Sequence, residues 1–366
     1  MRLLAAIPGI TLILVILWDA FETIILPRRV TRRLRLTSVF YGSIWAFSSS
    51  IARSMRNHKR REKYLGMFGP LSLLMLLAMW AAGLIIGYTI LLWATDSELN
   101  VSPAATTFGT YLYLSGVTFF TLGYGDVAPL LPLGRLIVVA EAATGFGLLA
   151  IVIGYLPVLY QAFSRREVNI SLLDARAGSP SSAAEMLRRH GESGHMHELS
   201  KVLHEWERWS AELMESHLSY PVLCYFRSQH DNQSWLAALT TVLDTCSLVM
   251  VGVDGAPAWQ AKLTFAMARH AVVDIAQVFR TAPSAPQSCI TRLYPGDLER
   301  IREILEISSA HLRDGEDADL KLAELRLMYE PYVSALSEML LMPLPPWILG
   351  SDAIDNWKTS AWGRIQ

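Results

Sequence analysis

The chain has 366 residues, of which 52% are hydrophobic, and 32 Lys and Arg oppose 33 Asp and Glu. The charge is uneven: residues 27–66 hold eleven basic residues and one acid, whereas residues 165–366 hold 19 basic and 26 acidic residues. The three cysteines, all in the second part, have no paired spacing, which argues against a disulfide framework and a cysteine zinc site. The sequence therefore divides into an apolar and basic first part and an acidic second part that is long enough to bury its own core.

An apolar run opens the chain, from Leu3 to Trp18, and continues less purely to Leu26. A cleaved signal peptide is the alternative to a membrane span. However, no small-x-small cleavage site follows, and the run leads directly into Pro27–Arg33, an arginine-rich stop-transfer pattern. We therefore expect residues 1–27 to form an uncleaved transmembrane helix.

Residues 28–66 form a basic segment that we expect on the cytoplasmic side, where Arg28–Lys63 would contact anionic lipid headgroups. Within it, Leu36–Arg53 is apolar enough to be inserted, but it contains five serines and has basic clusters on both sides. Insertion would place one of those clusters outside the cell. An interfacial helix on the inner leaflet is therefore the preferred interpretation, with insertion as the alternative.

Two longer apolar runs follow. Met67–Thr95 contains no charged residue, and Leu136–Phe163 contains only Glu141. A helix needs roughly 20 apolar residues to cross the ~30 Å hydrocarbon core, so both runs are long enough. Between them, Ala104–Phe120 is predicted as a shorter, half-buried helix that ends at the hexapeptide Thr121–Asp126.

The hexapeptide, Thr-Leu-Gly-Tyr-Gly-Asp, resembles the selectivity filter of the potassium-channel pore-loop family, whose usual form is Thr-Val-Gly-Tyr-Gly-Asp. The order of helix, short helix, filter and helix also resembles the two-transmembrane pore unit of that family. The resemblance covers residues 67–163 and implies an outer helix at 67–95, a pore helix at 104–120, a filter at 121–126 and an inner helix at 135–163. A glycine-rich hairpin turn in a soluble domain is the alternative, and the apolar flanks argue against it.

A dehydrated K⁺ ion needs rings of oxygen atoms in place of its water, and stacked backbone carbonyls from four loops provide them. The resemblance implies that K⁺ is bound by four successive residues: Thr121, Leu122, Gly123 and Tyr124. Gly123 and Gly125 would take backbone angles that a side chain forbids, Tyr124 would brace the filter, and Asp126 ends it. Leu122 replaces the usual valine and should pack behind the filter. Because one loop supplies a quarter of a filter, we expect a homotetramer that passes K⁺ down its gradient without a further cofactor.

Basic loops stay in the cytoplasm. Residues 28–63 are therefore expected inside and the N-terminus outside, with the loop Asp96–Pro103, which has two acids and no base, also outside. The inner helix would return to the cytoplasm at Arg165. Pore-loop channels likewise need a filter that enters from the external face, so we expect a multi-pass protein of the cell membrane, the bacterial inner membrane, with a cytoplasmic second part.

Several residues in the spans are candidates for gating or for bracing the filter. Glu141 lies about two turns into the inner helix and by register would face the pore helix. There its carboxylate would either accept hydrogen bonds from Thr, Tyr or Trp groups around the filter, or titrate. Gly145 lies eleven residues after Gly134, the spacing of a glycine hinge in related channels, and Pro157 invites a kink. Close helix packing is the alternative role for the glycine. The candidates for the cavity wall are Thr144, Leu149 and Ile153.

Asp19 and Glu22 lie one turn apart near the inner end of the first span. Either they pair with Arg28, Arg29 or another basic residue at the headgroup level, or they contact the pore module or couple it to protons. No span carries arginine at every third position, so no voltage sensor is expected.

Residues 164–366 are predicted as a cytoplasmic all-α domain that regulates the pore. Apolar residues recur at three- and four-residue spacings within five segments: Leu199–Leu218, Trp235–Val251, Ala258–Phe279, Leu298–Leu312 and Leu320–Leu341. No alternating strands precede them, so neither a nucleotide-binding Rossmann fold nor a cyclic-nucleotide β-roll is expected, and Gly252–Gly255 is expected as a helix end. Trp206 and Trp209 are expected in the core. The cytoplasmic ligand or protein partner is left open.

The histidines His190, His195, His197 and His204 form the one suggestive cluster, for which a solvated surface is preferred over a metal site. No nucleophile stands at a recognisable spacing from a base, so no enzyme is expected, and no nucleic-acid partner is expected either. The expected fold class is an all-α membrane protein. Two alternatives to a potassium channel stay open: a non-selective cation channel of the same fold, and a membrane-anchored signalling or scaffold protein with a vestigial pore.

Overall fold

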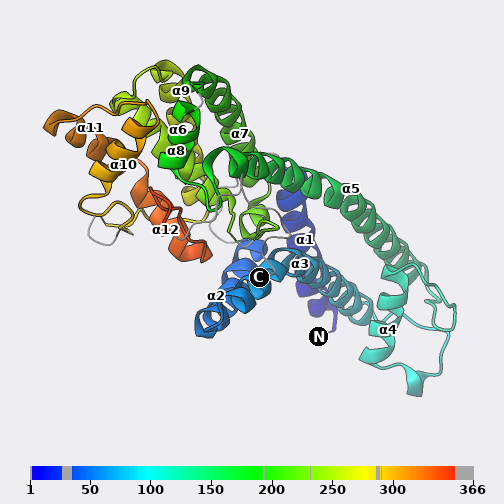
Figure 1. Cartoon of the computed structure of the whole chain (residues 1–366). Coiled ribbons are helices and arrows are strands. Elements are labelled where there is room, and N and C mark those ends of the chain that lie inside the picture. The colour runs from blue at the N-terminus through cyan, green and yellow to red at the C-terminus, as the bar shows by residue number, and fades with distance from the viewer. Residues whose placement is uncertain are drawn as a thin grey trace, which may run out of the picture. The chain divides into compact units, whose positions relative to one another are not determined.

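The computed structural model describes residues 2–26, 35–192, 194–230, 232–285, 289 and 291–350. Throughout this part of the chain the regular structure is helical (Figure 1), and extended segments pair only in two isolated bridges, Leu99 to Pro129 and Val253 to Leu312. The predicted all-α fold class is therefore confirmed. The chain divides into two compact units. We call Met1–Met55 with Met67–Gln161 the span unit, and Arg56–Gly66 with Ala162–Gln366 the bundle unit.

The span unit contains the segments that the sequence predicts to cross or line a membrane. Its helices are η1 Arg2–Ala5, α1 Ala6–Ala20, the π-helical turn η2 Phe21–Ile25, α2 Leu36–Ser54, most of α3 His58–Ala94, η3 Pro103–Ala105, α4 Phe108–Phe119 and most of α5 Pro132–Ala177. Three of them are long and apolar enough to cross a membrane: Ala6–Ile25, α3 and α5. α4 begins later than the predicted Ala104, because the Thr107 side chain caps its first turn by accepting from the Thr110 amide.

Helices α3 and α5 are longer than the predicted spans, and each belongs to both units. α3 begins at His58 rather than at Met67, and α5 continues past Phe163 to Ala177. The added turns contain many Lys, Arg, Glu and Leu residues, which favour helix, and no Pro interrupts them. Pro157, the predicted kink, lies inside α5, which continues through it as one element.

Glycines allow α1 to pack closely against α3. A Cβ atom at Gly87 would lie 2.7 Å from Cγ1 of Ile13, and one at Gly83 would overlap Cδ1 of Ile16. A Cβ atom at Gly9 would lie 3.0 Å from the carbonyl oxygen of Gly87. Gly83 and Gly87 are four residues apart, the small-xxx-small pattern that lets transmembrane backbones approach each other. The first span is therefore packed against the predicted outer helix.

Asp19, near the end of α1, is buried and joins three helices. Its carboxylate accepts hydrogen bonds from the amide of Thr37 at 3.2 Å and from the Thr37 hydroxyl at 2.6 Å, both at the start of α2. It also accepts from Nε1 of Trp80 in α3 at 3.0 Å. Without the carboxylate, the Thr37 amide and the Trp80 indole would lose their acceptor between apolar helices, whereas the Thr37 hydroxyl would keep its contact with Thr23 at 3.1 Å. The two lost bonds explain why a charged group is kept at this depth.

Glu22, one turn further on, is held by neighbours of its own. It accepts from Nε1 of Trp18 at 2.7 Å, and its second oxygen lies 3.6 Å from Nε of Arg35. Arg28 and Arg29, the partners predicted for both acids, lie outside the described residues. Glu22 thus has a basic residue nearby, as one of the two interpretations predicted. Asp19 instead contacts Trp80 of the predicted outer helix, which is the other interpretation, contact with the pore module.

The bundle unit begins with the first turns of α3 and the last turns of α5 and continues through a compact set of helices. These are α6 Ala183–Glu192, η4 Met196–Glu198, α7 Leu199–Ser219, η5 Pro221–Tyr225, α8 Trp235–Gly252, α9 Ala258–Val278, α10 Asp297–Ile307, α11 Glu316–Leu327 and α12 Glu330–Leu340. Trp206 and Trp209 are each 2% exposed with ring centroids 4.5 Å apart, as predicted for the core.

Two predicted helices of the bundle unit are wrong in extent. The segment Leu320–Leu341 is not one helix but two, α11 and α12, because Pro331 lacks an amide hydrogen and cannot continue a helix from the preceding turn. α10 ends at Ile307 rather than at Leu312, and the chain reverses at Ser309, whose φ is +60°. In both places an apolar pattern continued beyond the point where the backbone turns.

Helix α8 fulfils the length and composition criteria for a membrane span, but it is the central helix of the bundle unit. Of its residues, 83% are buried inside the structure, compared with 28% for Ala6–Ile25. It packs against α6, α9, α11 and α12. A helix that is apolar on all sides and covered on all sides by other helices is a core helix. The sequence pattern predicts a helix here but not its complete burial.

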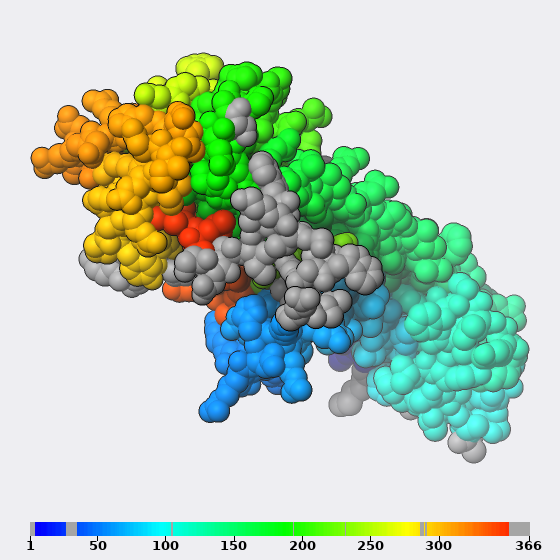
Figure 2. All heavy atoms as spheres, in the orientation of Figure 1, coloured from blue at the N-terminus to red at the C-terminus, as the bar shows by residue number. Residues whose placement is uncertain are grey.

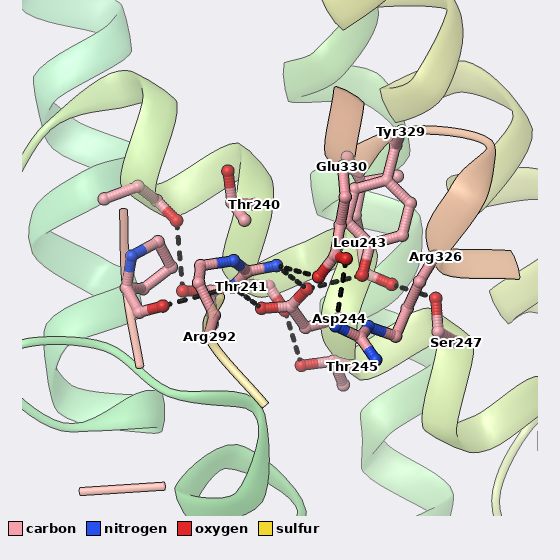
Figure 3. A network of polar contacts seen from close by, with 12 residues as sticks. Thr240, Thr241, Leu243, Asp244, Thr245, Ser247, Arg292, Arg326, Tyr329 and Glu330 are labelled. Carbon is pink, nitrogen blue, oxygen red and sulfur yellow. Dashed lines mark hydrogen bonds and ion pairs between the residues drawn. The ribbon is translucent and has the colours of Figure 1, made fainter. Parts of the chain in front are cut away.

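A buried ionic network joins parts of the bundle unit that are distant in sequence (Figure 3). The carboxylate of Asp244 in α8 accepts hydrogen bonds from both terminal nitrogens of Arg292, at 2.7 and 2.8 Å. It also accepts a hydrogen bond from the hydroxyl of Tyr329 at 2.6 Å. Arg292 also donates to Glu330 at 3.0 Å, and Arg326 lies 3.0 Å from the other oxygen of Glu330. Since an unpaired buried charge costs several kcal/mol, the network fixes the start of α12 and the segment around Arg292 against α8.

Candidate functional site

The predicted filter begins where α4 ends, and its first amides are bound to that helix. The amide of Thr121 donates to the carbonyl of Thr118 at 2.9 Å, and the amides of Leu122 and Gly123 both donate to the carbonyl of Val117, at 2.8 and 3.3 Å. The N–H and C=O groups of one planar peptide unit point in opposite directions, so the carbonyls of Phe120, Thr121 and Leu122 point away from the helix end. The last carbonyls of α4 also give its C-terminus a partial negative charge, which favours a cation nearby.

The backbone angles of the hexapeptide alternate in a way that few sequences allow. Gly123 has a φ of +53° and Gly125 a φ of +80°, both in the left-handed region that side chains disfavour. Thr121, with a φ of +57°, takes the same conformation in spite of its branched side chain, at a cost of order 1–3 kcal/mol. A chain that alternates between left-handed and ordinary residues can direct successive carbonyls to one side.

The outer end of the hexapeptide is fixed by hydrogen bonds to neighbouring segments. The hydroxyl of Tyr113 in α4 donates to Asp126 at 2.8 Å. Beyond it, the amide of Asn100 donates to the carbonyl of Ala128 at 3.0 Å, and the Asn100 side-chain oxygen accepts from the Ala128 amide at 2.7 Å. In Figure 2 this region, drawn in cyan, forms one continuous surface. The loop before α4 and the segment after the hexapeptide thus hold each other in place.

Large apolar side chains of the hexapeptide and its surroundings are exposed in the single chain. Phe120 is 59% exposed, Leu122 55% and Tyr124 68%. Leu122 therefore does not pack behind the filter within its own chain, and most of the Tyr124 side chain is exposed. Exposed apolar patches of this kind mark surfaces that contact either another protein or a membrane.

Glu141, the one charge in the predicted inner span, lies fully buried against α4. The hydroxyl of Ser115 in α4 contacts both Oε1 of Glu141 and, at 2.9 Å, the carbonyl oxygen of Ile85 in α3. The second carboxylate oxygen is buried without a hydrogen-bond partner among the described residues. Glu141 therefore connects α5 to the helix that carries the hexapeptide, on the side that its register predicts.

Gly145, one turn further along α5, is where the end of α4 comes closest. A Cβ atom there would overlap the carbonyl oxygen of Phe119 and lie 3.2 Å from its Cα. This geometry favours the packing role of Gly145 over a hinge. The hydroxyl of Thr144 is bound to the hydroxyl of Tyr88 at 2.8 Å, so this residue faces α3 rather than a cavity. The other predicted cavity residues, Leu149 and Ile153, are 55% and 64% exposed.

Within the bundle unit, Arg166 holds the last turns of α5 against the segment around Leu223 and Phe226. The sequence pattern did not single out this residue. Its guanidinium donates to the carbonyls of Leu223 and Phe226, both at 2.9 Å, and lies 3.3 Å from Nε2 of His217. Nδ1 of His217 lies 2.9 Å from the carbonyl of Leu213, which can only accept, so Nδ1 carries the ring proton and Nε2 accepts from Arg166. Burial, reinforced by the Arg166 charge, holds the pKa of His217 well below its ordinary value.

The predicted histidine cluster is not brought together around a common point. His197 and His204 are exposed and lie 3.3 and 3.7 Å from the carboxylates of Glu198 and Glu207. His190 is half-buried, with Nδ1 2.7 Å from the carbonyl of Met186. Among the described residues no group of three or more His, Cys, Asp or Glu side chains could hold a metal ion.

The comparisons with known proteins identify one domain. Residues 74–161 match the model of the family described as "Ion channel", and this range includes α4, the hexapeptide and Glu141. The chain therefore contains an ion-channel domain. Among curated proteins, an uncharacterized membrane protein of Bacillus subtilis (strain 168), YdjJ, is 23% identical over 194 residues, 52% of this chain and 56% of the relative. The chain thus spans about half the length of that relative. No solved structure matches the chain.

Proposed function

We propose that this chain is the subunit of a potassium-selective channel that passes K⁺ passively through a pore formed by four copies. The observation that carries the proposal is the backbone of the hexapeptide: its amides are bound to the end of α4, and Gly123 and Gly125 take left-handed angles. Carbonyls held in this way are the ligands that replace the water of a K⁺ ion. The ion-channel domain at residues 74–161 supports the same function.

Tetramer formation is proposed from the exposed apolar surface around the hexapeptide. Phe120, Leu122 and Tyr124 would be covered by neighbouring copies, and one loop supplies only a quarter of a ring of carbonyls. We further propose that the N-terminus and the loop Asp96–Pro103 lie outside, and that the bundle unit is cytoplasmic and regulates the pore. The basic segment Arg28–Lys63 would then contact anionic headgroups of the inner leaflet.

The proposal is tested by flux through liposomes that contain the purified protein. We expect K⁺ flux with a reversal potential that follows the K⁺ gradient and not the Na⁺ gradient. Gly123→Ala and Gly125→Ala should each abolish it, because a methyl group disfavours their backbone angle. Gly109→Ala is the matched control in α4, since its Cβ would make only an ordinary 3.6 Å contact. Selective flux in either filter variant would refute the filter, and equal K⁺ and Na⁺ permeability would indicate a non-selective channel.

Glu141 is proposed to brace the filter rather than to contact the ion. Glu141→Gln keeps the shape and an acceptor for Ser115, so the K⁺/Na⁺ preference should be preserved while the open probability shifts. Glu141→Leu removes the acceptor and should weaken the tetramer, because the buried hydroxyl loses a partner. Single-channel recording separates these roles: an altered unitary conductance with unchanged gating in Glu141→Gln would assign the residue to the ion path instead.

A further inference from the structure

The bundle unit contains a hollow between the first two turns of α3 and the segment that follows η5. Its volume is about 390 Å³, which lies within the range of ligand pockets. Lys59 and Lys63 of α3 lie on one side, and Arg227, Ser228 and Gln233 lie on the other. Every lining residue except Gly66 has a polar or charged side chain, so a polar ligand would find hydrogen-bonding partners here.

Cations outnumber acids in this pocket. Lys59 and Lys63 are one turn apart on α3, both are exposed, and neither has a carboxylate partner among the described residues. Glu62 is the one acid among the lining residues, and its carboxylate lies 3.7 Å from Arg227 and 3.7 Å from Arg61. One carboxylate shared by two arginines leaves the charge of both lysines uncompensated, and such a pocket attracts an anion.

Arg227 is held in position without being fully neutralised. Its terminal nitrogens donate to the carbonyls of Leu340 at 2.6 Å and of Leu341 at 3.1 Å, so its plane is fixed before any ligand arrives. Burial lowers the pKa of Arg227 to about 10 in spite of the nearby Glu62, which leaves the group charged at neutral pH. A fixed guanidinium beside two mobile ammonium groups matches the geometry and charge of a phosphate group.

The pocket is lined by one helix that continues into the ion-channel domain, and one of its lining residues is hydrogen-bonded to the other. Lys59 and Lys63 belong to α3, which runs as one element to Ala94. The hydroxyl of Ser228 donates to Glu167 of α5 at 3.2 Å, and Glu167 lies next to Arg166. A group that binds here therefore contacts α3 directly and is connected to α5 through Ser228.

We propose that this pocket binds a phosphate-bearing anion, a phosphomonoester or phosphate itself, and that its occupancy regulates ion flux. The two lysines would reach the phosphate oxygens, Arg227 would orient them, and the Gln233 amide would complete the set of donors. The regulatory half rests on the proposed channel function, whereas the binding half does not.

The phosphate could come from a lipid headgroup or from a soluble molecule. Lys59 to Gly66 spans about 10 Å along the helix axis, and Met67 directly follows as the first residue of the predicted span, so a headgroup phosphate is within reach. The soluble and the lipid source share the same recognition chemistry. They are distinguished by the probe that binds.

Binding is measured first, on the full-length protein in detergent. The probes are inorganic phosphate and glycerol phosphate by calorimetry, and short-chain phosphatidic acid against phosphatidylcholine by native mass spectrometry. We expect the double variant Lys59→Gln with Lys63→Gln to bind the probe with an affinity lower by about tenfold or more, since each charge-assisted contact contributes about that factor. The control, Lys201→Gln with Lys262→Gln, makes the same change of charge elsewhere in the bundle unit and should bind as the wild type does.

Each outcome decides one part of the proposal. Binding of the soluble probes that the lysine pair controls supports a soluble ligand, and binding of phosphatidic acid alone supports a lipid headgroup. No binding of any probe, or equal binding by both double variants, overturns the site. Flux in liposomes with and without the bound probe then tests regulation. Unchanged flux overturns the regulatory half, whereas a wild type that conducts no ion under any condition refutes the proposed function and leaves the binding result standing.

Discussion

The span Ala6–Ile25 and helix α8 are alike in length and apolar composition, but 28% of the first and 83% of the second is buried. α1 contacts α3 along one side and exposes large side chains such as Leu14 and Trp18 on the other. α8 is covered by other helices of the bundle unit and exposes almost nothing. Helices of similar length and composition can thus lie either in a membrane or in a protein core. Which of the two applies depends on how much of each helix is covered by other helices.

The two units also differ in how they accommodate buried charge. In the span unit, Asp19 and Glu141 are single carboxylates, each bound by neutral donors such as Trp80 and Ser115. Glu22, near the end of the first span, has both a neutral donor and a cation, Arg35, 3.6 Å away. In the bundle unit, Asp244 is bound by Arg292 within a network of opposite charges. Neutral donors satisfy a carboxylate without requiring a second charge to leave water, which is the less costly arrangement among apolar helices.

The largest effect is expected in the bundle unit, where a charge partner can be removed. Arg292→Leu leaves Asp244 and Glu330 buried without their shared cation, and breaking such a pair costs about 3–5 kcal/mol. Unfolding of the detergent-solubilised protein in denaturant, followed by circular dichroism, should show the loss. Arg208→Ala, which removes an exposed partner of Glu212, is the control and should change stability little. Wild-type stability in Arg292→Leu would mean that the network does not hold the bundle together.

The corresponding change in the span unit is Asp19→Ala. It removes the acceptor of the Thr37 amide and hydroxyl and of the Trp80 indole, at about 1–3 kcal/mol for each donor left unpaired. The thermal unfolding temperature in detergent should fall, and Asp19→Asn should recover much of the loss because one oxygen acceptor remains. Thr11→Val, which removes only a bond to the preceding turn of α1, is the control. If Asp19→Asn were as damaging as Asp19→Ala, the negative charge itself would be required.

A steric change tests whether α1 belongs to the pore assembly. Gly87→Ala places a methyl group 2.7 Å from Ile13, and overpacking of this kind costs about 1–3 kcal/mol. Thermal unfolding should therefore begin at a lower temperature. Gly42→Ala in α2, where a methyl group would meet nothing within 4 Å, serves as the control. Equal melting of the two variants would show that α1 can move away from α3 at no cost.

The smallest effect is a dependence on pH that the bundle unit should show through His217. Because its pKa is lowered in the folded chain, the unfolded state binds the proton first as the pH falls, and stability is lost below about pH 6.5. The slope is at most about 1.4 kcal/mol per pH unit until the folded pKa is reached. His217→Gln keeps an acceptor for Arg166 and should flatten this slope in thermal unfolding between pH 7.5 and 5.5. His204→Gln, at an exposed position, should retain the wild-type slope.

The all-α fold and the ion-channel domain could be predicted because their signals are local. The uncharged run Met67–Thr95 by itself predicts a membrane span. The hexapeptide with its two required glycines by itself predicts a filter. Pro331 marks the break between α11 and α12, but the apolar pattern continues across it and predicts a single helix. The full length of α5 was missed, because its last turns are polar and a membrane argument ends where the apolar run ends.

The contacts between distant segments could not be predicted. Asp244 and Arg292 are 48 residues apart, and nothing in either neighbourhood indicates the other. The same holds for Arg166 and His217, 51 residues apart. Gly83 and Gly87 did carry a signal, the small-xxx-small spacing, which predicts that a helix packs there but not which one. The exposed Leu122 and Tyr124 show the remaining limit, since their surroundings are supplied by other chains in the proposed assembly.

The uninterrupted helices α3 and α5 have a consequence for how this chain can vary. A residue inserted between Phe163 and Arg166 would turn everything that follows it by about 100° about the helix axis and shift it by about 1.5 Å. Steps of about seven, eleven or eighteen residues restore the original phase to within about 20°, and a matching step would be needed in α3. Chimaeras that exchange the bundle unit should therefore keep helical phase at both junctions, and natural relatives should differ there by lengths that restore it.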